Sequence, residues 1–309
     1  MDSSRERAPI ALFVYNRADA TRQTLDALAR NNGASDSDLV IFSDGAKGET
    51  DAAQVADVRA LTVNIQGFRS VRVVQAASNR GLAPSIISGV TEIVEERGCV
   101  IVLEDDILTS PVFLDFMNDA LDLYRNEEKV GSISGYIFPL DIGLPETFFL
   151  RDEASWGWAT WSRAWAKFEP DGRKLLAALE RQNKTRKFDV DASFPFTNML
   201  RDQIAGHNSS WAIRWRASIF LNDMLSLYPG GSLVRNIGTD GSGTHASRSD
   251  SMYDSVPRIT PVKVRPITIA ENEEIFRALR RYYRKHFAPQ LHHRILRKLK
   301  RFLQDLRRH

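Results

Sequence analysis

Three consecutive carboxylates, Glu104, Asp105 and Asp106, directly follow an unbroken apolar run, and they are the residues of this chain best placed to do chemistry. Carboxylate oxygens are the ligands that hard divalent cations such as Mg²⁺ and Mn²⁺ prefer. Adjacent carboxylates also repel one another unless a cation offsets their charge. The triplet therefore predicts a metal site. The alternative is a solvated loop that leads into a helix N-terminus, where acids are also favoured.

The run before the triplet, residues 99–103, is short, contains several β-branched side chains and lacks alternation. This pattern is typical of a central parallel strand that is covered on both faces. In open α/β sheets, ligands bind at the carboxyl ends of such strands. The sequence thus places the acidic triplet at an edge where ligand sites form.

Three more apolar segments precede this strand, and stretches with helical features separate them. Strands are expected at residues 10–15, 39–43 and 71–75, and helices at 20–30, 54–65, 84–96 and 111–124. Asn16 or Asp19 is expected to cap the first helix. Strands that alternate with helices predict an α/β fold with a mostly parallel sheet, flanked by helices and joined by right-handed crossovers.

The regular alternation stops near residue 140, and the chain changes character there. All six tryptophans lie between Trp156 and Trp215. Indole rings supply both core volume and flat binding surface. We expect most of them to form a second core and one or two to face a substrate. This predicts a first half over residues 1–140, a second over 141–270 and a helical tail over 271–309.

The net charge of +3 hides an uneven distribution. Residues 277–309 contain 12 Lys and Arg against one acid, a balance of +11, so residues 1–276 carry −8. Residues 291–306 form an amphipathic pattern with basic residues outside the apolar stripe, which is typical of a helix lying on an anionic membrane surface. Docking of this helix on the domain or on a partner is the alternative.

Composition excludes several protein classes. The only cysteine, Cys99, lies in an expected strand, so no disulfide framework forms and a reducing, cytoplasmic setting is expected, with peripheral contact to the inner membrane face through the tail. No secretion signal or membrane-spanning run of about 20 apolar residues is expected. The phosphate-binding patterns GxxxxGK[ST] and GxGxxG are absent. Residues 236–251, rich in Gly, Ser and Asp, predict a long functional loop that contains His245.

The order of several motifs resembles a known family. They are FVYNRADATRQTLDAL (13–28), IFSDGAKGET (41–50), SNRGLAPSIISGV (78–90), VIVLEDDILTSPVFLDFMNDAL (100–121), GWATWSRAWAKF (157–168) and LVRNIGTDGSGTH (233–245). In this order they resemble metal-dependent glycosyltransferases of the GT-A fold. Within that group they are similar to bacterial sugar transferases related to the N-acetylglucosaminyltransferase I type.

The resemblance implies a site for a nucleotide sugar and for Mn²⁺ or Mg²⁺. It implies Asp106 and His245 as metal ligands, Asp105 as a residue that bonds the ribose or a metal-bound water, and Glu104 as the residue that orients the two aspartates. Arg17 and Arg80 are implied diphosphate contacts, because a guanidinium matches phosphate geometry. Asp44 matches an acid that contacts the uracil ring.

At the base that activates the acceptor, this chain departs from the family it resembles. The related transferases place an acid just before a tryptophan, where this chain has Asn208-Ser209-Ser210-Trp211. Asp202, in the preceding helix, is the first candidate for the base. Asp152 and Glu153 are the alternatives.

The expected function is transfer of a sugar, with inversion, from a UDP-sugar to a glycan or lipid-linked glycan acceptor in cell-surface polysaccharide synthesis. A sugar nucleotidyltransferase shares the sheet, the metal and the nucleotide, and is one alternative. A noncatalytic module that binds an anionic membrane or nucleic acid through the basic tail is another, although no nucleic-acid partner is expected.

Overall fold

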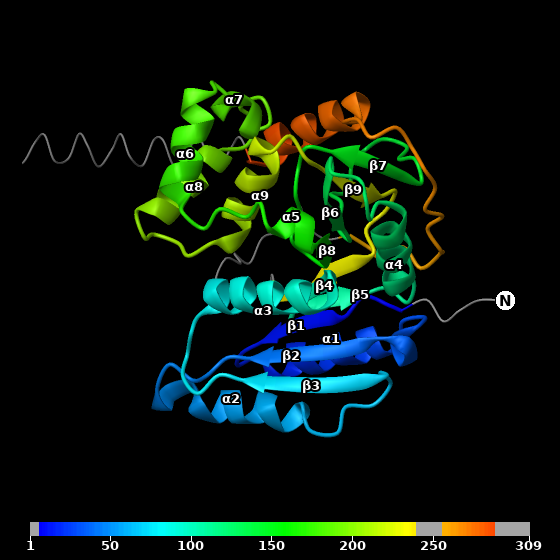
Figure 1. The fold of residues 1–309 in the computed structure, drawn as a ribbon, viewed down its shortest axis with the longest axis vertical. Helices are drawn as coiled ribbons and strands as arrows, with labels where there is room; N and C mark the ends of the chain where they lie inside the picture. Colours follow the sequence, from blue (N-terminus) through cyan, green and yellow to red (C-terminus); the bar gives the residue numbers. More distant parts are fainter. Residues whose placement is uncertain (1–5, 239–254, 288–309) are drawn as a thin grey trace, which may run out of the picture.

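The computed structural model describes residues 6–238 and 255–287, and its centre is an eight-stranded sheet of order β3-β2-β1-β4-β8-β6-β9-β7 (Figure 1). Its strands are β1 Ile10–Val14, β2 Asp38–Ser43, β3 Ser70–Gln75, β4 Cys99–Glu104, β6 Val130–Ser134, β7 Thr147–Leu150, β8 Trp158–Trp161 and β9 Leu225–Pro229. Only β7 and β8 run opposite to the other six strands of this sheet. The predicted α/β class with a mostly parallel sheet is confirmed.

Helices flank the sheet on both faces (Figure 1). They are α1 Ala18–Ala29, α2 Glu49–Leu61, α3 Leu82–Arg97, α4 Phe113–Leu123, α5 Ser162–Trp165, α6 Gly172–Arg181, α7 Thr185–Phe188, α8 Phe196–Ile204 and α9 Trp211–Leu221, with a 3₁₀ turn η1 at Ala34–Asp36 and a helix over 273–287. The expected strands and helices of the first 124 residues agree with these bounds to within a few residues. The capping prediction was wrong, because Arg17 occupies the N-cap of α1 and no side chain caps it.

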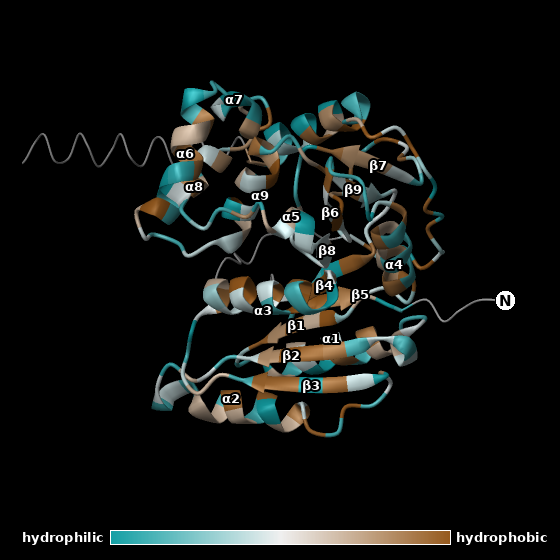
Figure 2. Cartoon of the chain, in the orientation of Figure 1, coloured by the Kyte–Doolittle hydropathy of each residue, from teal (hydrophilic) through white to brown (hydrophobic). Residues whose placement is uncertain are grey.

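The central strands are apolar along their length, as expected for strands covered on both faces (Figure 2). Every residue of β1 is buried, as are the four central residues of β4. Helix α3 approaches β1 closely at Gly89, where an added Cβ would lie 2.9 Å from the Phe13 ring. Phe13 in turn stacks on Phe42 at 4.9 Å between ring centroids. This packing fixes where the carboxyl ends of the strands lie.

The reversed strand β8 lies between β4 and β6. Trp158 pairs with Val102 and Trp161 with Cys99, so β8 begins at the carboxyl end of β4. Five tryptophans are buried: Trp158, Trp161, Trp165, Trp211 and Trp215. Trp156 is only partly buried. Most of the tryptophans are therefore core residues, as expected, but they belong to the same hydrophobic cluster as the parallel strands and form no separate second core. One hydrophobic cluster extends from Ala8 to Val262, so the two halves expected from the sequence share it.

The helix over 273–287 packs against the last two strands in the sheet order, β9 and β7. Its Ile275, Leu279 and Tyr283 join Phe148 and Tyr228 in a second hydrophobic cluster. The expected amphipathic helix over 291–306 lies outside the described residues. Within residues 6–238 and 255–287, none of the helices has the length and apolar character required to span a bilayer.

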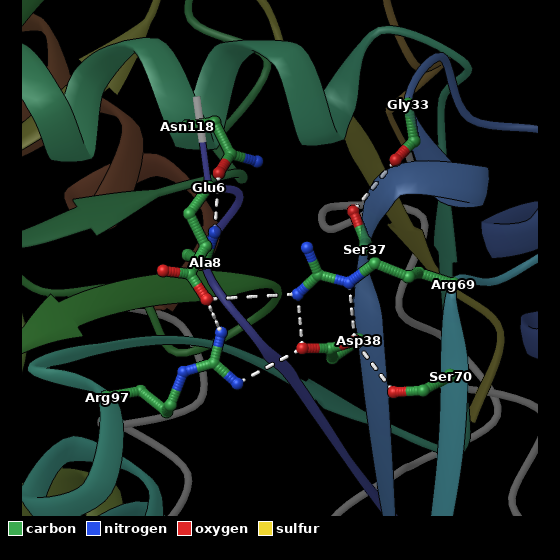
Figure 3. A network of polar contacts seen from close by, with 9 residues as sticks. All are labelled: Glu6, Ala8, Gly33, Ser37, Asp38, Arg69, Ser70, Arg97 and Asn118. Carbon is green, nitrogen blue, oxygen red and sulfur yellow. Dashed lines mark hydrogen bonds and ion pairs between the residues drawn. The ribbon is translucent and has the colours of Figure 1, made fainter. Parts of the chain in front are cut away.

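A network of ion pairs ties together the amino ends of the parallel strands (Figure 3). Asp38, at the start of β2, pairs with Arg69 just before β3 and with Arg97 at the end of α3, the latter at 3.1 Å. Glu6 pairs with Arg97 from the segment that leads into β1. The hydrogen bonds from Arg69 are the main reason that the pKa of Asp38 lies well below its usual range. Two acids thus face two arginines at this edge.

Candidate active site at the carboxyl edge of the sheet

The opposite edge of the sheet brings the acidic triplet next to Arg17. Arg17 follows β1, and the triplet begins at the last residue of β4, the parallel neighbour of β1. The Arg17 guanidinium bonds Asp105 through Nη2 and, at 3.4 Å, through Nε. Its Nη1 lies 2.9 Å from Oδ2 of Asp106. Arg17, which follows β1, therefore bridges two carboxylates that follow the adjacent strand β4.

The carboxylates of this site are largely withdrawn from water. Asp105 is 4% exposed and Asp106 is 8% exposed. Burial, together with repulsion from Asp106 and Asp105, raises the pKa of Glu104 to about 8. Burial also raises the pKa of Asp105 to about 6, although Arg17 acts against the rise. The alternative of a solvated loop before a helix N-terminus was wrong, since the triplet is mostly buried and strand β5 (Ile107–Thr109) follows it.

Neighbouring elements hold the main chain of the triplet in place. The Thr24 hydroxyl of α1 donates to the carbonyl of Asp105 at 2.9 Å. On the other side, β10 (Val234–Asn236) pairs antiparallel with β5, and the Ile237 amide donates to the carbonyl of Asp106 at 2.9 Å. At Gly238 an added Cβ would overlap the Asp106 carboxylate. Ile237 and Gly238, at the start of the Gly- and Ser-rich segment, therefore lie against the acidic site. His245 lies outside the described residues.

The donor set fits a hard divalent cation that is only partly enclosed by protein. Arg17 pairs with Asp105 and Asp106, and Glu104 directly precedes them, so the three acids and the arginine together carry a surplus of two negative charges when all three acids are ionised. Within residues 6–238 and 255–287, no group of three His, Cys, Asp or Glu side chains is placed to hold a metal by itself. Mg²⁺ commonly binds through one or two carboxylates and completes its shell with substrate phosphates. Asp106, with Asp105 beside it, matches that arrangement.

Asp44 organises the turn that leads into α3. Its carboxylate accepts hydrogen bonds of 2.8 to 3.0 Å from the amides of Gly45, Arg80 and Gly81 and from the side chain of Asn79. These four bonds match the roughly four acceptor positions of a carboxylate. Asp44 therefore holds the loops after β2 and β3 together. The side chain of Arg80, on the same turn, is exposed.

The structure separates the candidates for the base. Asp202 lies on α8 with 45% of its side chain exposed, 3.6 Å from His207. Ser210, in the segment where the resemblance expects an acid, instead caps α9 by accepting from the Ile213 amide at 3.2 Å. The serine at this position therefore has a structural role in starting the helix.

Asp152 and Glu153 are both buried, at 7% and 8% exposure, but their surroundings differ. Asp152 forms an ion pair with Arg216 of α9 and accepts a hydrogen bond from Tyr283. Oε1 of Glu153 has no hydrogen-bond partner in the described part of the chain. Burial raises the pKa of Glu153 to about 8. Both acids line a cavity of about 210 Å³ that also contacts Trp156.

Sequence reasoning missed Arg216, which is 5% exposed and completes this cavity. The available signal was an arginine inside the segment Trp215–Phe220, which is otherwise apolar except for Ser218. A buried arginine needs a carboxylate partner. Asp152, more than 60 residues earlier in the chain, supplies it. Only the fold brings these two residues together.

Comparisons with known proteins give limited similarity. No protein-family model matches the chain, and no curated protein matches it either. Among solved structures, S. aureus TarS is similar over 38% of this chain with 16% identity and a TM-score of 0.28, and the chain spans a fifth of the length of TarS. The mannosyltransferase PcManGT from Pyrobaculum calidifontis, in complex with GDP-Man and Mn²⁺, is similar over 72% of each chain, with 13% identity and a TM-score of 0.39. Neither likeness is close enough to assign an activity.

Proposed function

We propose that this chain is a metal-dependent glycosyltransferase of the GT-A type. It transfers a sugar from a nucleotide sugar, with UDP as the expected nucleotide, to a glycan or lipid-linked glycan acceptor with inversion. Residues 1–140 form the half that binds the donor, and residues 141–270 form the half that binds the acceptor. The basic tail, outside the described residues, is expected to bring the enzyme to an anionic membrane surface.

The observation that carries this proposal is the buried surplus of carboxylates at the carboxyl edge of the sheet. Three consecutive acids lie there and Arg17 pairs with two of them, Asp105 and Asp106. Burial and the neighbouring carboxylates raise the pKa values of Glu104 and Asp105. An uncompensated buried charge is costly. A divalent cation together with a diphosphate removes the surplus and supplies oxygen ligands for the remaining metal positions. The order of motifs in the sequence independently points to the same donor class.

Residues of this chain have different proposed roles in binding the metal and the diphosphate of the donor. A bound Mn²⁺ or Mg²⁺ supplies positive charge that stabilises the leaving diphosphate. Asp106 is the proposed metal ligand, while Asp105 and Glu104 keep the site negative and orient it. Arg17, which pairs with Asp105 and Asp106, is the first proposed diphosphate contact. Arg80, exposed on the turn held by Asp44, is the second proposed diphosphate contact.

Glu153 is the proposed base. A base that removes a hydroxyl proton works best with a pKa near the operating pH. Glu153 has such a value and lines a cavity, whereas Asp152 is committed to Arg216 and Asp202 is half exposed on α8. The geometry therefore favours Glu153 over the first candidate from the sequence.

Calorimetry with UDP-, GDP- and dTDP-sugars in Mn²⁺, followed by an assay of metal-dependent sugar release, tests the donor assignment. One nucleotide sugar should bind only with metal, and Asp106→Ala should reduce turnover by at least about 100-fold, since the metal's charge stabilises the transition state. Asp57→Asn, an exposed acid of α2, is the matched control and should be unchanged. Full metal-dependent turnover by Asp106→Ala would refute the proposal, and pyrophosphate release from a nucleoside triphosphate would favour a nucleotidyltransferase.

A further inference from the structure

The cavity beside Glu153 lies on the acceptor side of the molecule and has a distinct chemistry. Its volume of about 210 Å³ is below the roughly 300–1,000 Å³ of pockets that take drug-sized ligands, so it matches a single ring. It is lined by residues of several elements, including Tyr136 after β6, Trp156 before β8, Met199 of α8 and Tyr283 of the helix over 273–287. No single secondary-structure element forms it.

Packed aromatic rings form one wall of this cavity. Trp156 contacts Tyr136 edge-to-face at 4.6 Å between centroids. Phe194 packs on Phe196 at 4.4 Å and on Tyr283 at 5.2 Å. Rings that support one another in this way keep their positions when a ligand binds. A flat apolar wall with a polar indole edge suits a ligand with both C–H faces and hydroxyl groups.

The cavity also contains polar groups that need partners. Oε1 of Glu153 and Nε of Arg216 are buried with no hydrogen-bond partner among the described groups. The Arg216 guanidinium lies 3.6 Å from the centroid of the Phe196 ring, and its charge is matched by Asp152. An unmade hydrogen bond of a buried polar group costs about 1–3 kcal/mol. A ligand with several hydroxyl groups would remove this cost at both residues.

The cavity is connected to the donor edge through the main chain. Strand β8 begins opposite Val102, just upstream of the acidic triplet, so the segment with Glu153 and Trp156 leads to that edge. The Gly135 amide donates to the carbonyl of Gly157 at 2.6 Å, and the Leu233 amide donates to the carbonyl of Gly135 at 2.8 Å. Leu233 directly precedes β10, which reaches Asp106. Main-chain hydrogen bonds and strand pairing therefore link the segments that form the cavity to the segments that form the acidic site.

We infer that this cavity binds one pyranose ring of the acceptor, with a C–H face of the ring against Trp156 and hydroxyl groups directed to Glu153 and Arg216. This inference rests on the proposed function and identifies the acceptor as a saccharide at the point of attack. An alkyl or isoprenyl chain is the competing occupant, since much of the lining is aromatic. It would leave Glu153 and Arg216 without partners.

Saturation-transfer difference NMR on the full chain tests this occupant directly. The probes are methyl pyranosides of gluco, galacto and manno configuration, and octyl β-glucopyranoside, which carries a ring and an alkyl chain in one molecule. We expect saturation of the ring protons of at least one methyl pyranoside, and stronger saturation of the ring than of the chain in the octyl glycoside. Saturation confined to the alkyl chain, or none for any probe, would overturn the inference.

Variants locate the bound ring. Trp156→Ala should weaken acceptor kcat/KM by about 10-fold or more through KM, whereas Trp156→Phe, which keeps an aromatic face, should stay within about 3-fold of the wild type. Met199→Trp, at a side chain that is 36% exposed at the cavity, should remove the NMR signal by filling the space. Val63→Trp, at an exposed site just after α2, is its matched control. Unchanged ring signals in Met199→Trp would show that the ring binds elsewhere.

Calorimetry separates this inference from the proposed function. Donor and Mn²⁺ should bind to Trp156→Ala and Met199→Trp as they do to the wild type, because neither residue lies at the acidic triplet. If no donor binds to the wild type, the proposed function is contradicted. Normal donor binding without any ring saturation contradicts only the acceptor pocket.

Discussion

The two edges of the sheet use the same residue types and reach opposite electrostatic states. At the amino edge, Asp38 and Glu6 meet Arg69 and Arg97, two acids against two arginines (Figure 3). At the carboxyl edge, three acids follow one another and Arg17 pairs with two of them, Asp105 and Asp106. Hydrogen bonds from Arg69 lower the pKa of Asp38, whereas burial raises the pKa of Asp105 to about 6 and of Glu104 to about 8.

This difference distinguishes a structural network from a binding site. Where charges balance, the lowered pKa of Asp38 means that its ionised form is more stable in the folded protein than in the unfolded chain, so its ion pairs favour folding. Where acids are in excess, folding holds them in an unfavourable state that an added cation relieves. Groups whose pKa values are shifted in this way are typical of functional sites. The comparison predicts that changes at the two edges respond differently to metal.

The largest effect should come from removing the only arginine that contacts the triplet among the described residues. Arg17→Ala leaves Asp105 and Asp106 without a partner and should lower the free energy of unfolding by about 3 kcal/mol in EDTA. Mn²⁺ should restore much of this loss, since a ligand of the folded state stabilises by mass action. Urea denaturation with and without Mn²⁺ measures both effects.

Arg69→Ala is the control from the opposite edge. It also removes an arginine from a carboxylate, the partly buried Asp38, but Arg97 remains as a partner. Its loss of stability should be the same in EDTA and in Mn²⁺. Equal recovery of both variants by Mn²⁺ would show that the metal does not act at the triplet.

Glu153 extends the comparison to an acid that lacks a bonded cation among the described residues. Its folded pKa of about 8 lies above the usual 4.5, so the folded state binds more protons than the unfolded state between these values. The free energy of unfolding therefore falls as pH rises through this range, by at most about 5 kcal/mol for this shift. Glu153→Gln should be more stable than the wild type by about 2 kcal/mol at pH 8.5 and by much less at pH 5. Thermal unfolding over this pH range measures the difference, and an equal gain at both pH values would mean that Glu153 is not a buried titrating acid.

The sequence predicted the carboxyl edge well because its signals are local. An apolar run that ends in Glu104-Asp105-Asp106 predicts, within eight residues, a strand with acids at its carboxyl end. The carboxyl ends of parallel strands lie on the same side of the sheet, where ligands bind. Arg17 and Asp44 follow other strands of the same sheet, so the pattern placed them at the same edge. What it did not predict is that the acceptors of Asp44 are filled mainly by the turn after β3.

The acceptor side could not be predicted in the same way, since its contacts are distant in the sequence. Strands β7, β8 and β10 are only three or four residues long, too short for a periodic pattern to stand out. The pairing of Arg216 with Asp152 depends on where α9 lies over the sheet. The sequence ranked Asp202 ahead of Glu153, because it does not show that Glu153 is buried and Asp202 is about half exposed.

The contact of Gly238 with the triplet offers a smaller, local change at the carboxyl edge. Gly238→Ala places a methyl group where the Asp106 carboxylate and Nη1 of Arg17 now lie, so both should shift. We expect Mn²⁺ affinity to fall by about 10-fold, as for residues that orient metal ligands. Calorimetry with Mn²⁺ and the donor measures this loss. Gly143→Ala, at a glycine with open space around it, is the control, and equal losses in the two variants would exclude the contact as the cause.

The smallest effect should be found at the balanced edge. Because the folded pKa of Asp38 is lowered, its ion pairs stabilise the protein above the unfolded pKa of about 4, and this contribution is lost as pH falls through the lower folded value. Asp38→Asn should therefore cost about 1 kcal/mol at pH 7 and less at pH 3, a modest value because Arg69 is partly exposed. Urea denaturation at the two pH values measures this trend, while donor and Mn²⁺ affinities should stay at wild-type values. A loss of metal binding in this variant would mean that the two edges are coupled, and the balanced network would then be part of the site.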